Sequence, residues 1–406
     1  MKSLTTTALT SAIAAAMAIT AGLCTPINFA SARDSVAPVA TVAAVEEIKA
    51  GKADKPVKQP LVQLAILIDT SNSMDGLIAQ AKQQLWRIVN EFIAVKRDGQ
   101  RPLVQVALFE YGNDRLPASE GHILQVLPLT DDLDKVSEKL FALKTNGGQE
   151  YCGQVIQAAV DRLKWSKSND DLKVVFIAGN EAFTQGPVNY AKSCKKAISK
   201  GIQINTIFCG NAAAGINGKW KDGAVLADGS YTSIDHNARI VDIKTPYDKP
   251  LATLGVDMNK TFVPYGKQGK EGFANQARQD SNSSGVSLSN LAQRSVAKGS
   301  SNYRNDSWCL VDAVSLKNID IAKIKTEDLP ENMRKMTLAE KKKYIGEMKT
   351  KRDTINKKIM ALNKQRQTYI AAEQKKLAEK GEETFDKAVV DSVRKQAEAK
   401  KFKFEK

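Results

Sequence analysis

The chain has 406 residues, and 60 Lys and Arg against 45 Asp and Glu give it a formal net charge of +15. This length suits one domain of ordinary size with an appendage. Beyond the N-terminal region no stretch approaches about 18 consecutive apolar residues, which excludes a transmembrane helix in the mature chain. The positive charge suits acidic partners, anionic lipid headgroups or cell-wall polymers.

Residues 1–32 are predicted to be a secretory signal peptide. Lys2 supplies a short positive region, Ala8 to Leu23 is apolar, and Ala30-Ser31-Ala32 is a small-residue cleavage site, so cleavage is expected after Ala32. We therefore expect a periplasmic or secreted protein, and export argues against nucleic acid as a partner. Residues 33–60 are rich in Ala, Val, Lys and Pro and are predicted to form a flexible linker.

The stretch from Leu61 to Met74 begins with a nearly continuous apolar run, which is followed by polar residues. The apolar run through Ile68 predicts a strand covered on both faces, as in a parallel sheet. Three oxygen donors follow at alternate positions, at the strand end where open α/β sheets place their sites: Asp69, Ser71 and Ser73. Oxygen ligands favour Mg²⁺, or Mn²⁺ or Ca²⁺, over zinc. The alternative is a Ser/Asn turn that only caps the next helix.

Strand and helix patterns alternate from there to residue 234, which predicts a doubly wound, mostly parallel sheet. The second and third strands are joined by residues 112–117 and a further Gly without a helix, so one antiparallel edge strand is expected. The expected strands are 62–68, 103–111, 122–127, 172–177, 203–208 and 231–234, and the expected helices are 77–95, 133–143, 152–163, 188–200 and 220–226.

This pattern and the Asp-x-Ser-x-Ser loop resemble the von Willebrand factor type A family over roughly residues 61–234. We assign residues 61–265 to such a domain. The resemblance implies a metal-ion-dependent adhesion site in which Asp69, Ser71 and Ser73 are ligands. It also implies a protein partner that offers a carboxylate to the bound cation.

Two further loops of the family site differ here. Gln149 or Glu150 stands where the family has Thr, and Gly179 stands where it has Asp. Either Glu150 and Glu181 restore the missing charge, directly or through water, or the site is degenerate. Glu150 has an alternative role as a carboxylate at a helix start, and Glu181 has one as a solvated surface residue.

No nucleophilic catalysis is expected, because His122 and His236 fall at other strands than Ser71 and Ser73. No phosphate-binding loop is present in the sequence. The leading hypothesis is thus an exported, non-enzymatic module for cation-dependent protein binding at the cell envelope. The alternatives are a structural envelope protein with a degenerate metal site and a basic surface-binding tail, and a metal-dependent hydrolase.

Four cysteines follow the predicted signal peptide, namely Cys152, Cys194, Cys209 and Cys309. An even number in an exported chain is compatible with two disulfides in any of three pairings, and a bridge among the first three is conceivable. Buried free thiols are the alternative.

Residues 266–330 are predicted to be a loop-rich extension that docks on the main domain, with a mobile loop at 266–285 and a strand at 308–314. Residues 331–406 hold 22 basic and 12 acidic residues and are expected to form a basic amphipathic helical region. A long helix over 337–378 and a second helix after Gly381 would form a hairpin or lie across the main domain. The alternative is a coiled-coil or surface-binding arm that attracts anionic envelope surfaces.

Overall fold

The computed structural model describes residues 59–93, 95–234, 242–379 and 385–404. The predicted signal peptide, most of the predicted linker, His236 and Gly381 lie outside these ranges. No helix within them is long and apolar enough to cross a membrane.

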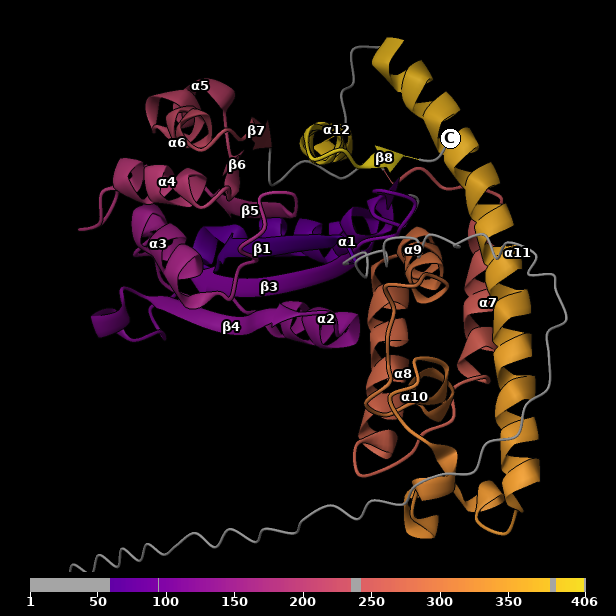
Figure 1. The fold of residues 1–406 in the computed structure, drawn as a ribbon. Helices are drawn as coiled ribbons and strands as arrows, with labels where there is room; N and C mark the ends of the chain where they lie inside the picture. The colour runs from indigo at the N-terminus through magenta and orange to yellow at the C-terminus, as the bar shows by residue number, and fades with distance from the viewer. Residues whose placement is uncertain (1–58, 94, 235–241, 380–384, 405–406) are drawn as a thin grey trace, which may run out of the picture. The chain divides into compact units, whose positions relative to one another are not determined.

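A six-stranded sheet with the order β4-β3-β1-β5-β6-β7 forms the centre of the first part (Figure 1). Pairs β1–β3, β1–β5, β5–β6 and β6–β7 are parallel, and β3–β4 is antiparallel. The strands are β1 Leu61–Asp69, β3 Leu103–Tyr111, β4 Ile123–Thr130, β5 Leu172–Gly179, β6 Gln203–Cys209 and β7 Tyr231–Ile234. The predicted fold class, with its single antiparallel edge strand, is confirmed.

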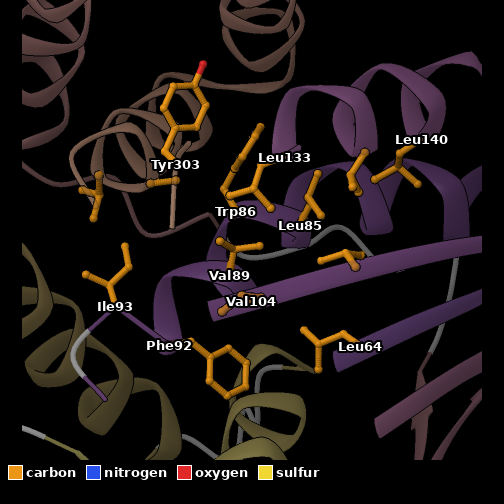
Figure 2. Close-up of a cluster of buried hydrophobic side chains, with 14 of the residues drawn as sticks. Leu64, Leu85, Trp86, Val89, Phe92, Ile93, Val104, Leu133, Leu140 and Tyr303 are labelled. Atoms are coloured by element: carbon orange, nitrogen blue, oxygen red, sulfur yellow. The ribbon is translucent and has the colours of Figure 1, made fainter. Parts of the chain in front are cut away.

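Helices cover both faces of this sheet because its strands are apolar on both. Leu64 of β1 packs with α1 (Asp75–Glu91) and α2 (Leu133–Ala142), whereas Leu67 packs with α3 (Cys152–Arg162) and α4 (Tyr190–Ser199). Figure 2 shows the first of these clusters, in which Val89 of α1 lies near Val104 of β3 and Trp86 lies near Leu133 and Tyr303. Two short helices, α5 (Ala212–Asn217) and α6 (Trp220–Leu226), follow β6.

The rest of the chain is more helical than expected. The predicted loop at 266–285 is wrong, since α8 spans Gly269–Val286, and its buried polar residues Asn275, Gln276 and Gln279 explain why no apolar pattern marked it. The predicted strand at 308–314 is also wrong. Cys309 makes one isolated bridge to Pro264, and α10 (Leu310–Ser315) follows it.

The remaining helices pack on the sheet domain and on one another. α7 (Asp248–Asn259) packs on α9 (Leu288–Lys298), and α9 packs on α1. The long helix α11 (Leu338–Glu379) contacts α7, α9 and α10. It starts at a capping box, in which the Thr337 backbone N–H donates to Glu340 (2.7 Å) and the Glu340 backbone N–H donates to the Thr337 hydroxyl (3.3 Å).

The last helix, α12 (Phe385–Ala399), returns to the sheet and contacts α1 and β7. The side-chain amides of Gln396 and Asn205 on β6 donate to each other at 2.9 and 3.0 Å, and the Ser392 and Ser230 hydroxyls lie 2.6 Å apart. After α12, β8 (Lys403–Phe404) pairs with β2 (Val95–Lys96).

All four cysteines of the described residues are buried free thiols, so of the two alternatives the structure has the free thiols and not the disulfides. Cys152 and Cys209 belong to the clusters on opposite faces of the sheet, which explains why they do not pair. Burial raises the pKa of each thiol, and raises that of Cys194 to about 12.

Candidate functional site

The site lies at the carboxyl end of the parallel strands. β1 ends at Asp69, whose side chain is fully buried, and whose Oδ1 accepts from the Ser71 backbone N–H at 2.8 Å. The following loop is held to its neighbours by backbone bonds, since Thr70 donates to Tyr111 (2.8 Å) and Asn72 donates to Gly147 (2.9 Å). These bonds place the loop between the end of β3 and the loop that precedes α3.

The loop before α3 brings Glu150 to Asp69. Glu150 is 3% exposed, and its backbone N–H donates to the Gln185 side chain at 2.7 Å. Gly112, with φ +77°, makes room for the two carboxylates, because a Cβ there would lie 2.6 Å from Asp69 Oδ1 and 2.9 Å from Glu150 Cγ. A side chain at this position would separate the pair.

Both carboxyls are costly to ionise in this environment. Burial, followed by the neighbouring Glu150, holds the pKa of Asp69 well above its usual range. Burial also raises the pKa of Glu150, and the charge of Glu181 adds to that effect, while Asp69 and Ser71 oppose it. Two buried carboxylates side by side call for a proton or a cation between them.

Three buried oxygens at the site have no hydrogen-bond partner among the described residues: Asp69 Oδ2, Glu150 Oε2 and Asn180 Oδ1. Asn180 follows β5, and its Nδ2 donates to Ser73 Oγ at 3.0 Å. Ser73 Oγ in turn lies 3.2 Å from Ser71 Oγ. The unpartnered oxygens therefore border the two serine hydroxyls, and this donor set fits a hard cation.

Asn180 was not among the predicted ligands, although an amide oxygen next to Gly179 was visible in the sequence. Its neighbour Glu181 has an exposed side chain, and the Glu181 backbone carbonyl accepts from the Trp220 indole N–H at 2.7 Å. The structure thus brings Asp69, Ser71, Ser73 and Glu150 together and leaves the Glu181 carboxylate at the outer rim. Within the described residues no three His, Cys, Asp or Glu side chains form a metal cluster, so a cation here would need the hydroxyl and amide oxygens.

Tyr111 fills the space beside Gly179, where a family carboxylate was expected. Its buried hydroxyl donates to the Ala178 carbonyl at 2.9 Å, and a Cβ on Gly179 would lie 2.5 Å from that hydroxyl and 3.2 Å from Asp69 Oδ2. Burial raises the pKa of Tyr111 well above its usual range, and the nearby Cys152 and Asp69 add to the effect. The phenol is therefore a neutral donor here.

Neither serine at the site is set up as a nucleophile. Ser71 and Ser73 contact each other and Asn180, and the His122 ring packs edge-on against Tyr151, with centroids 6.2 Å apart. The arrangement suits binding through a held cation more than acyl or phosphoryl transfer.

Residues 63–215 match the family model described as the von Willebrand factor type A domain. No curated protein matches the chain. Among solved structures, the conserved hypothetical protein BatB from Bacteroides thetaiotaomicron is 16% identical, with 43% of this chain and 90% of that chain covered and a TM-score of 0.33. The SpRpn10 VWA domain is 20% identical, with 43% and 88% covered and a TM-score of 0.32. Proximal thread matrix protein 1 from the mussel byssus, with a zinc-occupied MIDAS motif, is 18% identical, with 44% and 43% covered and a TM-score of 0.33.

Proposed function

Because residues 63–215 form a von Willebrand factor type A domain, we propose that this chain is an exported binding module that recruits a protein partner through a divalent cation at the cell envelope. The family is known for metal-dependent protein interactions. The observation that carries the proposal is the set of buried, unpartnered oxygens of Asp69, Glu150 and Asn180 beside two serine hydroxyls.

Asp69 and Glu150 would supply the negative charge, and Ser71 and Ser73 would supply neutral oxygens at the entrance. Asn180 adds a further neutral oxygen. Glu181, with its exposed carboxylate, would act at the rim through water. The all-oxygen donor set favours Mg²⁺, with Mn²⁺ or Ca²⁺ as alternatives.

A cation bound there supplies a Lewis-acidic point for an oxygen of the partner. Ser73 is exposed whereas Asp69 and Glu150 are buried, so the accessible side of the site is the serine side. A partner carboxylate would be favoured because it adds charge neutralisation to its coordination. The predicted N-terminal signal peptide and the net charge support an envelope location.

Calorimetric titration of the mature protein with Mg²⁺, Mn²⁺ and Ca²⁺ tests the cation. Asp69→Asn removes a charge without changing side-chain size and should weaken binding about tenfold or more. Asp75→Asn is the matched control. Asp75 is exposed, and its Oδ1 accepts from the Thr145 hydroxyl (2.7 Å) and from no residue of the proposed cation site. Wild-type protein that binds none of the three ions at millimolar concentration would refute the proposal.

The partner is tested by capture from envelope extract with Mg²⁺ and again with chelator. We expect a protein that is retained by wild type with Mg²⁺ and lost with chelator or in Asp69→Asn. Retention that is the same in all three conditions would show that binding does not pass through the cation site.

A further inference from the structure

One face of α11 is fixed on the molecule by buried side chains. The Arg366 guanidinium contacts Asp248 at 2.7 Å and Ser289 at 2.8 Å, and Arg352 donates to the Thr261 hydroxyl and carbonyl at 2.9 and 2.7 Å and pairs with Asp312. The apolar residues of this face are Ile345, Met348 and Ile359. Because these residues recur at helical spacing, the rotation of α11 about its axis is set.

The opposite face carries a line of exposed lysines: Lys343, Lys357, Lys364 and Lys375. Their separations of 14, 7 and 11 residues are close to whole numbers of turns, which places all four within an arc of about 60°. The line is about 48 Å long at 1.5 Å per residue. Mostly small residues lie between them on the same side, including Gly346, Thr350, Ala361 and Thr368.

None of the described acids forms a direct ion pair with a lysine of this line, although Glu347 and Glu379 stand one turn after Lys343 and Lys375. On α11, Asp353 pairs with Lys349 at 2.6 Å and Glu373 pairs with Lys376 at 2.7 Å. In the described part of the chain, none of the four line lysines takes part in an ion pair. Their charges therefore add along one edge of the helix.

We propose that this lysine line docks the protein on an anionic lipid bilayer. A straight row of about 48 Å matches a plane of headgroups, whereas a small anion would need cations that converge on one point. The phosphates of a nucleic acid duplex wind away from such a row. Lysine side chains extend from the helix to place their ammonium groups at the surface while the helix backbone stays outside the headgroups.

This surface is independent of the cation site. It lies on α11, and the residues that orient it are Arg352 and Arg366 rather than any residue of the Asp69 loop. If the cation site bound no metal, this lysine surface alone would be enough for the alternative function, a structural envelope protein with a basic surface-binding tail.

Co-sedimentation of the full mature chain with vesicles tests the proposal, in chelator and at low salt. The vesicles are pure phosphatidylcholine, or phosphatidylcholine with about one-third phosphatidylglycerol. The variant replaces Lys343, Lys357, Lys364 and Lys375 with Gln. Its matched control replaces four exposed lysines of the sheet domain with Gln, at Lys167, Lys192, Lys195 and Lys221, so that both variants lose the same net charge.

We expect wild type and the control to bind only the anionic vesicles, and the α11 variant to bind them at least about tenfold more weakly. Raising the salt should release wild type, since the attraction is screened. Equal loss in both variants would show that diffuse net charge is responsible and would overturn the proposal. So would a lack of binding by wild type, or equal binding to vesicles of both compositions.

Discussion

The loop after β5 could contribute to the cation site through either Asn180 or Glu181. Its Oδ1 is buried and unpartnered, while the Glu181 carboxylate is exposed. Asn180→Asp should strengthen divalent-cation binding, because it adds charge beside Ser73, and Asn180→Leu should weaken it, because it removes an oxygen. Calorimetry of both variants measures this.

Glu181→Gln is the control for these two variants and should change cation affinity less than Asn180→Leu does. If Asn180→Leu bound cations as wild type does, Asn180 would not be a ligand. Circular dichroism would show that each variant keeps the native fold.

The Tyr111 hydroxyl leaves no room for a side chain at position 179, where the family has Asp. Gly179→Ala should destabilise the fold by about 1–3 kcal/mol, since its Cβ would overlap the Tyr111 hydroxyl. Tyr111→Phe removes that hydroxyl, so in the double variant the two costs should be less than additive. Urea unfolding of the four proteins gives the coupling, and strict additivity would contradict a direct clash.

Much of the site followed from the sequence because its signals are local. Asp69, Ser71 and Ser73 lie within five residues at a strand end. The partnership of Asn180 with Ser73 joins residues 107 positions apart, and the space taken by Tyr111 depends on packing between β3 and β5. Neither leaves a pattern within one segment.

At the level of elements, Arg294 of α9 links the sheet domain to the helices that follow it. Its fully buried guanidinium contacts Asp134 of α2 at 2.7 Å and Asp280 of α8 at 2.5 Å, and it lies over the Trp86 ring at 4.8 Å. Burial would raise the pKa of Asp280, but the attraction of Lys298 and Arg294 outweighs it and lowers that pKa. Arg294 is therefore the cation that pairs with Asp134, whereas Asp280 is shared between Arg294 and Lys298, which lies 2.8 Å away.

Arg294→Met should lower the free energy of unfolding by about 3–5 kcal/mol, because it leaves Asp134 and Asp280 without their shared partner. Arg278→Gln is the control. Its ion pair with Glu271 is solvent-exposed and should contribute at most about 1 kcal/mol. Similar losses in the two variants, measured by denaturant unfolding, would contradict this role for Arg294.

The sheet strands were predictable as elements because apolar runs and turn residues mark them. α8 was not, because it buries Asn275, Gln276 and Gln279 against polar partners such as Ser137, whose hydroxyl donates to Gln279 at 2.8 Å. A helix that packs through amides has no apolar stripe to recognise. The long helix predicted over 337–378 is present as α11 (Leu338–Glu379), because Ile345, Met348 and Ile359 do leave such a stripe.

On the scale of the whole described chain, one apolar cluster runs from the sheet into the C-terminal helices. It includes Leu64, Trp86 and Tyr303 (Figure 2), together with Val296 and Ile359. We expect a single cooperative unfolding transition, with the same midpoint by far-ultraviolet circular dichroism and by tryptophan fluorescence. Two separated transitions would show that the helices after β7 fold as an independent domain.

The return of α12 to β6 also affects how the chain can fold during synthesis. Gln396 and Asn205 are 191 residues apart, so the ribosome needs roughly 10–40 s between them at 5–20 residues per second. Until residues 385–404 emerge, the sheet surface that α12 covers has no helix over it. The nascent domain therefore stays incomplete until residues 385–404 have been made, and it must rely on chaperones or on its own solubility for that time.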